Sequence, residues 1–245
     1  MNDALQTATA AEPLLFVDGL VKHYSDAGRI VRVLEGVHLE VQPAEKVAIV
    51  GESGVGKSTL LHILGALDDP TEGVVRYDAA DLRSLSPRAL AAFRNREIGF
   101  VFQFHHLMAD LSAEENVMMP ALISGVGWDR ARDQAREILG RVGLGERLEH
   151  KPGELSGGEQ QRVSVARAVV LSPRTLLADE PTGNLDPATG AEVQELLIEL
   201  NRERRVALIV VTHNPHLAAA MDRVLRLHGG VLEPVVKGEP LLAKI

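Results

Sequence analysis

Two glycine-rich segments, each followed by a helical pattern, constrain this chain more than any other feature. The first reads Gly-Glu-Ser-Gly-Val-Gly-Lys-Ser over residues 51–58, and the second reads Leu-Ser-Gly-Gly-Glu-Gln over residues 155–160. Glycine lets backbone N–H groups turn toward a bound anion, and a helix that starts there adds partial positive charge. One chain folded around one nucleotide needs only one such loop. The second loop therefore suggests a site that another copy of the chain completes.

The composition fits one sizeable α/β domain. A chain of 245 residues that is 45% hydrophobic has ample material for a buried core, which excludes wholesale disorder. The formal net charge is −8 and no cluster of Lys and Arg offsets it, so we expect no nucleic-acid partner. There is no cysteine, which excludes disulfides and thiolate metal sites.

The N-terminal residues 1–12 are rich in Ala and Thr and predict a flexible tail. They lack the basic start and the apolar run of a signal peptide. No stretch of the chain reaches the roughly 18 uninterrupted apolar residues of a membrane span. We therefore expect a peripheral protein on the cytoplasmic side, whose role at a membrane depends on a partner.

Short apolar runs alternate with helical periods and predict a mostly parallel sheet covered on both faces. Buried strands are expected at residues 46–50, 98–102, 175–178 and 206–211, and helices at 157–171 and 187–203. Residues 14–18 and 31–41 alternate like half-exposed antiparallel strands. In the helix after the first glycine loop, the apolar side chains expected to face inward are Leu60, Leu61, Ile63, Leu64 and Leu67.

The pattern changes between Phe104 and Glu154, where strand signals stop. Helical periods follow at residues 113–123 and 129–142. We interpret this stretch as a helical lobe inserted into the core. The prediction is one domain over residues 13–245, with the core at 13–103 and 155–245 and the lobe at 104–154.

The first glycine loop lies between a predicted strand and a predicted helix, which is the context of a phosphate-binding loop. There Lys57 can reach phosphate oxygens, and the Ser58 hydroxyl can bind Mg²⁺. The alternative is a glycine-rich turn that only fits the pattern. The nucleotide-binding residues predicted here are Gly51, Glu52, Ser53, Gly54, Val55, Gly56, Lys57, Ser58 and Thr59.

Two acids end the predicted strand at 175–178. Asp179 at the carboxyl end of a strand beside a phosphate loop is placed to hold Mg²⁺ through water. Glu180 is expected to point the other way along the pleat and to polarise an attacking water. The alternative is that both acids only cap the turn at residues 181–183.

Residues 155–162, Leu-Ser-Gly-Gly-Glu-Gln-Gln-Arg, match the signature of the ABC-type ATPases, and the resemblance covers residues 14–232. It implies a P-loop α/β core with an antiparallel β subdomain and a helical subdomain. It further implies that Tyr24 stacks on adenine, that Gln103 touches Mg²⁺ and senses a transmembrane partner, and that His213 is the switch histidine. Residues 184–186 resemble the loop that crosses between subunits. For Tyr24 and His213 the alternative is a packing role.

The same resemblance implies a head-to-tail dimer that encloses two ATP molecules with Mg²⁺. Each ATP would lie between the Lys57 loop of one copy and the second glycine loop of the other. The residues that this second loop would contribute are Ser156, Gly157, Gly158 and Glu159. Hydrolysis would then remove a shared ligand and let the copies part.

Within the family, residues 103–108 and 115–120 resemble the ATP-binding subunits of lipoprotein-releasing systems, the LolD family, in a group that includes MacB and FtsE. This implies an ATPase at the inner membrane that drives lipoproteins toward the periplasm without touching them. Two transmembrane subunits resembling LolC and LolE would dock near Phe104, His105, His106, Leu107 and Met118. One alternative is that these side chains form the lobe's own core. Others are an ATPase of a MacB-like exporter, an importer, or an FtsE-like regulator of cell division.

Overall fold

A computed structural model describes residues 12–26 and 28–235 of the chain. The tail predicted at residues 1–12 therefore lies outside the described residues, except for Glu12. Among the described helices, none combines the length and the hydropathy that crossing a membrane requires.

A six-stranded sheet forms the centre of the molecule, in the order β10-β9-β3-β8-β7-β6. All neighbouring pairs are parallel except β9 and β10, which form an antiparallel hairpin. The strands are β3 (Lys46–Val50), β6 (Ile98–Val101), β7 (Thr175–Asp179), β8 (Ala207–Val211), β9 (Arg223–His228) and β10 (Val231–Pro234). The predicted, mostly parallel sheet is confirmed.

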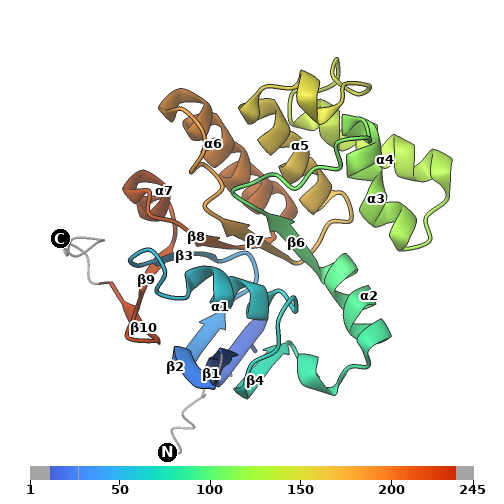
Figure 1. Cartoon of the computed structure of the whole chain (residues 1–245). Coiled ribbons are helices and arrows are strands. Elements are labelled where there is room, and N and C mark those ends of the chain that lie inside the picture. The colour runs from blue at the N-terminus through green and yellow to red at the C-terminus, as the bar shows by residue number, and fades with distance from the viewer. Residues whose placement is uncertain (1–11, 27, 236–245) are drawn as a thin grey trace, which may run out of the picture.

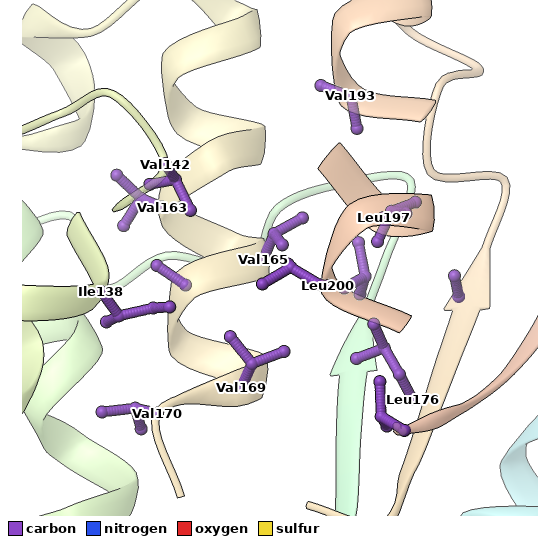
Figure 2. Packing of buried hydrophobic residues seen from close by; sticks show 14 of the residues in the cluster. Ile138, Val142, Val163, Val165, Val169, Val170, Leu176, Val193, Leu197 and Leu200 are labelled. Atoms are coloured by element: carbon purple, nitrogen blue, oxygen red, sulfur yellow. The ribbon is translucent and has the colours of Figure 1, made fainter. Parts of the chain in front are cut away.

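The strands of this sheet bury both faces because their side chains alternate between two hydrophobic clusters. In β3, Val47 and Ile49 belong to one cluster, and Ala48 and Val50 to the other. Helix α1 (Lys57–Leu64) packs in the first cluster, whereas α5 (Gly157–Val169) and α6 (Pro187–Arg204) pack in the second. Figure 2 shows side chains of α5 and α6 meeting above β7.

A second, antiparallel sheet lies on the α1 side of the molecule, in the order β2-β1-β4-β5 (Figure 1). Its strands are β1 (Leu15–Asp26), β2 (Arg29–Val41), β4 (Glu72–Tyr77) and β5 (Ala80–Asp81). The antiparallel subdomain predicted from the resemblance is confirmed, and its first two strands are longer than the alternation of apolar residues indicates.

Two helices lie beside α5 (Figure 1). In the sequence they come between β6 and the second glycine loop. They are α3 (Ala113–Ile123) and α4 (Trp128–Arg141), as the helical periods predict. Helix α3 begins at a capping box in which Ser112 accepts from the Glu115 N–H and Glu115 accepts from the Ser112 N–H.

Several elements have no counterpart in the predictions. They are β4, β5, β9, β10, α2 (Pro87–Glu97) and α7 (Pro215–Ala219). Helix α2 has no fully buried residue, and its Leu90 and Phe93 are only partly buried against the first cluster. Leu67 was predicted to face inward, but α1 ends at Leu64 and Leu67 is exposed in the following turn.

Candidate functional site

The first glycine loop connects the end of β3 to the start of α1 and has a conformation that needs glycine. Gly56 precedes α1 with φ of 107°, and a Cβ atom there would lie 2.6 Å from Val33 Cγ1. Gly54 has φ of 79°. These left-handed residues turn the loop around the start of α1, whose first-turn N–H groups receive no side-chain cap among the described residues.

Lys57 is the first residue of α1, and its side chain folds back over the loop. Its ammonium donates to the carbonyl oxygens of Gly51, at 3.0 Å, and Glu52, at 2.8 Å. The positive charge of Lys57 is thus held at the beginning of the loop. A phosphate entering here meets both a cation and the positive end of a helix dipole.

The carboxyl ends of β7 and β8 lie at the same sheet edge as this loop because β3, β8 and β7 are parallel neighbours. Asp179 is the last residue of β7. Glu180 follows outside the strand with φ of 45°, and its N–H donates to the Val211 carbonyl at 2.8 Å. The prediction that the pleat points the two acids in opposite directions is wrong, because Glu180 has left the strand and both acids line one cavity.

Two groups that follow β8 hold the Glu180 carboxylate. One oxygen accepts from the Thr212 hydroxyl and from the His213 N–H, both at 3.2 Å. The other oxygen lies 2.8 Å from His213 Nδ1. The Glu180 side chain is 13% exposed and that of His213 is 63% exposed, so the histidine covers the carboxylate from the solvent side.

Gln103 and Asn184 form a reciprocal amide pair beside the acids. The Gln103 side chain donates to Asn184 Oδ1 at 3.0 Å, and the Asn184 side chain donates to the Gln103 carbonyl at 3.1 Å. The segment that follows β6 is thus tied to the loop that follows β7.

These groups surround one cavity of about 520 Å³. Eleven of the predicted site residues line it, and Val33 of β2 is an addition. The predicted residues that line the cavity are Gly51, Ser53, Gly54, Gly56, Lys57, Ser58, Thr59, Gln103, Asp179, Glu180 and His213. The predicted site residues that do not line it are Tyr24, Glu52, Val55, Ser156, Gly157, Gly158 and Glu159.

The oxygen atoms in this cavity suit Mg²⁺. Ser58 and Gln103 offer a hydroxyl and an amide oxygen, and Asp179 offers a carboxylate. Mg²⁺ prefers such oxygen ligands, keeps several waters and is held by few protein groups. Among the described residues there is no group of three or more His, Asp or Glu side chains that could hold a metal by themselves.

The second glycine loop begins α5 with a different arrangement. The Ser156 hydroxyl accepts from the Glu159 N–H at 3.3 Å, and the Glu159 carboxylate accepts from the Ser156 N–H at 2.8 Å. Hydrogen bonds to the Glu159 carboxylate from the Ser156 N–H, from the Ser156 hydroxyl and from the Arg147 guanidinium, at 3.1 Å, lower the pKa of Glu159 to about 2. Ser156 and Gly157 are exposed, so this helix start faces solvent in a single copy.

Tyr24 stands at the edge of the cavity without lining it. On β2 its Cα partner is Val31, two residues before the cavity residue Val33. Tyr24 is 41% exposed and donates its hydroxyl to Asp68 at 2.7 Å. Asp68 was not predicted, because one acid in a turn carries no recognisable signal.

Gln161 is a further residue that the sequence did not single out. It is buried on α5, and its amide donates to the carbonyl oxygens of Pro181 at 2.7 Å and Phe102 at 3.3 Å. These carbonyls come directly after Glu180 and directly before Gln103. Helix α5 therefore supports both segments that carry cavity residues.

The predicted docking residues divide into exposed and buried ones. Phe104 is 68% exposed, His106 is also exposed, and His105 and Leu107 are half-buried. Met118 is fully buried in the core cluster, so its prediction as a docking residue is wrong and the alternative of a core role is confirmed for it. It lies in α3, which packs against both α4 and α5.

A groove of about 400 Å³ lies next to the exposed Phe104 segment. Its apolar lining includes Phe100 of β6, Phe102 directly after β6, Ile123 of α3 and Leu67 of the turn after α1. Arg167 of α5 also lines it and donates to the carbonyls of His105 and His106, at 2.8 and 2.7 Å. The groove thus separates elements of the core from α3.

Comparisons with known proteins agree with this geometry. A family model described as "ABC transporter" matches residues 34–183. The chain is 58% identical over 217 residues to the "Lipoprotein-releasing system ATP-binding protein LolD" of Geobacter metallireducens, a match that covers 89% of this chain and 96% of the relative. The protein of the same name from Nitratidesulfovibrio vulgaris is 54% identical, with 91% of this chain and 96% of that relative covered.

A solved structure shares the fold. It is described as a dimeric post-hydrolysis state of the ATP-binding cassette MJ0796 bound to ADP and phosphate. The TM-score is 0.83 at 39% sequence identity, and the match covers 89% of this chain and 96% of that chain. Since the family model matches more than half of the residues and the relatives match over nearly their whole length, this chain belongs to the ABC transporter family.

Proposed function

We propose that this chain is the ATP-hydrolysing subunit of a complex that releases lipoproteins from the inner membrane. One observation carries the hydrolytic part, namely that the Glu180 carboxylate, held by Thr212 and His213, lines the same cavity as Lys57. The identity of the cargo rests on the relatives, which carry the name of a lipoprotein-releasing system at 49–58% identity.

In this proposal the cavity binds the phosphates of ATP and Tyr24 receives the adenine. The glycine loop donates its N–H groups, and Lys57 exchanges its bonds to the Gly51 and Glu52 carbonyls for bonds to phosphate oxygens. That exchange is favourable because ammonium–phosphate hydrogen bonds are charge-assisted. Glu52 and Val55 contribute through the backbone of the loop.

Ser58, Gln103 and Asp179 hold Mg²⁺ in this proposal. When bound, the metal neutralises charge on the phosphate oxygens. The chain's own part is to place the three oxygen donors at one sheet edge, and the bond between Gln103 and Asn184 fixes the amide there. Gln103 is the only one of the three donors that also lies beside the Phe104 segment in the sequence.

Glu180 acts as the general base toward the attacking water, and His213 positions the Glu180 carboxylate. The hydrogen bonds from Thr212 and His213 fix the plane of the carboxylate. A positioned carboxylate contributes about 10²–10⁴-fold to such a reaction. The left-handed backbone of Glu180 is strained for a residue with a side chain, as is common at functional positions.

A second copy completes the site. Ser156, Gly157, Gly158 and Glu159 lie outside the cavity of their own chain, and the helix start that they form exposes Ser156 and Gly157. The similar cassette MJ0796 is described as dimeric with ADP and phosphate. Two copies in head-to-tail arrangement would place this helix start of one chain over the γ-phosphate held by the other, so closure depends on ATP and ends with hydrolysis.

In this arrangement the core and the helical lobe of the chain have different roles. The core at residues 13–103 and 155–245 binds and hydrolyses ATP, and the lobe at 104–154 receives the membrane partners. Each of two transmembrane subunits, resembling LolC and LolE, would place a short helix in this groove and contact the neighbouring segment with Phe104, His105, His106 and Leu107. The chain itself stays at the cytoplasmic face of the inner membrane and does not contact the cargo.

Purification of the chain from its native membrane tests the assembly. We expect two integral membrane proteins with large periplasmic domains to accompany it. Recovery of a periplasmic solute receptor would indicate an importer instead, and recovery with cell-division proteins alone would indicate a regulator.

A variant that binds but does not hydrolyse ATP tests the mechanism. Glu180→Gln, saturated with MgATP together with its membrane assembly, should bring the Lys57 loop of one copy against the Ser156 helix of the other. Cross-linking of cysteines introduced at Ser53 and Gly157 measures this contact. The mechanism fails if the two faces stay apart under saturating MgATP.

A further inference from the structure

The orientation of Tyr24 is fixed by a network of charged groups that the mechanism does not otherwise use. Its hydroxyl donates to Asp68 Oδ2 at 2.7 Å. Tyr24 belongs to β1 of the antiparallel sheet, whereas Asp68 belongs to the turn that follows α1. One hydrogen bond therefore joins the two parts of the molecule that flank the cavity.

Lys22 holds the other side of the same carboxylate. Its ammonium donates to Asp68 Oδ1 at 2.6 Å and to the Asp69 carbonyl at 2.7 Å, and its side chain is only 11% exposed. Desolvation raises the pKa of Asp68, but the hydrogen bonds from Lys22, Tyr24 and the Asp69 N–H outweigh it, so the pKa is lowered. Asp68 is thus a charged bridge between Lys22 and Tyr24.

The ammonium of Lys22 also lies over the ring of Tyr24, 4.7 Å from its centroid. A cation at this distance is attracted by the face of an aromatic ring. Since Tyr24 remains 41% exposed, the ring still has surface to offer to a ligand. The Tyr24 ring is thus held at its hydroxyl by the Asp68 carboxylate and on one face by the Lys22 ammonium.

We propose that Asp68 and Lys22 are positioning residues for the base of the nucleotide, which fix the plane of Tyr24 before the nucleotide arrives. The inference rests on the proposed function, in which Tyr24 receives the base. Preorganisation of this kind strengthens binding because fewer side chains must be ordered when the ligand binds.

The position of Asp68 gives the network a second consequence. Helix α1 spans Lys57–Leu64, so about 12 Å of rigid helix separates the phosphate site from the turn that carries Asp68. The same helix thus fixes the phosphate groups at its start and, through Asp68, the ring of Tyr24 near its end. The distance between the base and phosphate subsites is set by one element.

The test compares a ligand that has a base with one that has none. MgADP and magnesium pyrophosphate are titrated by calorimetry into the purified full-length chain, because neither ligand is hydrolysed at the site or offers a γ-phosphate for closure. Tyr24→Ala should weaken MgADP binding by about 10-fold, since the stacking of the base on an aromatic ring is lost. Pyrophosphate binding should stay within about twofold of the native value.

Tyr24→Phe and Asp68→Asn then isolate the network. Each variant should weaken MgADP binding by about three- to tenfold, because a hydrogen bond to a charged group is removed or weakened. Neither variant should change pyrophosphate binding. The double variant should bind MgADP no more weakly than the weaker single variant, since the bond between Tyr24 and Asp68 is already removed or weakened in each. Tyr24→Phe keeps the ring and changes one exposed atom, so it remains informative if Asp68→Asn folds poorly.

Asp222→Asn is the matched control. Asp222 pairs with Lys46 at 2.8 Å in a similar strand-to-turn arrangement, but Lys46 begins β3, at the opposite end from the glycine loop. This variant should bind both ligands like the native chain.

Three results separate the possible failures. If Asp68→Asn weakens pyrophosphate as much as MgADP, or if the two single effects add, Asp68 only supports the phosphate loop and the inference is wrong. If Tyr24→Ala weakens MgADP but Tyr24→Phe and Asp68→Asn do not, the inference is wrong and the base site stands. If Tyr24→Ala binds MgADP normally, the base site of the proposed function itself is wrong.

Discussion

The two glycine-rich helix starts of this molecule have opposite chemistry. Helix α1 begins after the left-handed Gly56 without a side-chain cap among the described residues, and its first residue is a lysine. Helix α5 begins with Ser156 in a complete capping box, and its third residue is an ionised glutamate. The first start leaves its N–H groups and a cation to a ligand, whereas the second pairs the N–H groups of Ser156 and Glu159 within its own capping box and adds a negative charge.

This difference explains why one chain needs two glycine-rich loops. An anion binds at a helix start when the N–H groups there are free and no negative charge opposes it. In a single copy the α1 start has free N–H groups with Lys57 beside them, whereas the α5 start carries the ionised Glu159 in its first turn. In the proposed dimer, the α5 start therefore adds to phosphates that the α1 start of the other copy already holds, and it does not bind them first.

The largest expected effect concerns Glu180, which lines the α1 cavity. Glu180→Gln should lower ATP hydrolysis by about 10²–10⁴-fold while MgATP binding is retained, because the amide keeps the shape but cannot take a proton. Phosphate release and MgATP binding measure the two properties. Glu195→Gln, an exposed position on α6, is the control and should hydrolyse ATP normally. Undiminished turnover in Glu180→Gln would remove Glu180 from the role of base.

The contrast between the starts of α1 and α5 is tested by changing one residue at each helix start. Lys57→Met should weaken MgADP binding to an isolated copy by about 10- to 100-fold, since a hydrogen bond from a charged donor to phosphate is lost. Ser156→Ala should leave this binding unchanged, because Ser156 does not line the cavity of its own chain. Calorimetry with each purified variant provides the measurement. Equal losses in the two variants would show that the starts act on the same nucleotide within one copy.

Much of the α1 site could be predicted from the sequence because it is local. Residues 51–59 are consecutive, and Asp179 and Glu180 end a buried strand, so a motif and the topology of parallel strands bring them together. The bridge between Lys22, Tyr24 and Asp68 could not be predicted in this way. It joins β1 to a turn that lies 46 positions after Lys22 in the sequence, and none of the three residues belongs to a periodic pattern.

The errors have a common physical reason. Met118 and Leu67 are both apolar, and composition alone does not say which of them is covered by a neighbouring element. Packing of α3 against α4 and α5 buries Met118, and the early end of α1 exposes Leu67. Glu180 was assigned to the pleat because the sequence gives no sign that the backbone turns left-handed after Asp179.

The two glycines of the α5 start are expected to differ in their contribution to stability. A Cβ at Gly158 would lie 2.2 Å from Thr189 Cγ2 of α6, so Gly158→Ala should destabilise the fold by about 1–3 kcal/mol. A Cβ at Gly157 would make an ordinary contact of 3.6 Å with Leu185 Cδ2, so Gly157→Ala should be neutral or stabilise by up to about 1 kcal/mol. Denaturant unfolding of both variants gives the comparison. A similar loss in both would mean that helix conformation, and not the close approach of α5 and α6, accounts for the glycines.

The smallest expected effect concerns the pH dependence of the α5 start. The Ser156 N–H and hydroxyl and the Arg147 guanidinium lower the pKa of Glu159 from 4.5 to about 2. A lowered pKa means that the folded state prefers the ionised form, so this stabilisation is fully present above pH 4.5 and is lost as the pH falls toward 2. Glu159→Gln lacks this ionisation, because a Gln side chain does not titrate.

The native chain and Glu159→Gln should therefore differ most in unfolding free energy near neutral pH, by about 1 kcal/mol or less for a partly exposed cap. The difference should shrink steadily between pH 4.5 and pH 2.5, and denaturant unfolding at several pH values measures it. Glu192→Gln, which removes an exposed partner of Arg162, is the control and should change the unfolding free energy near neutral pH by less than Glu159→Gln does. If the two chains instead differ by a constant amount at every pH, Glu159 caps α5 without its charge, and the electrostatic contrast between the two helix starts loses its basis at α5.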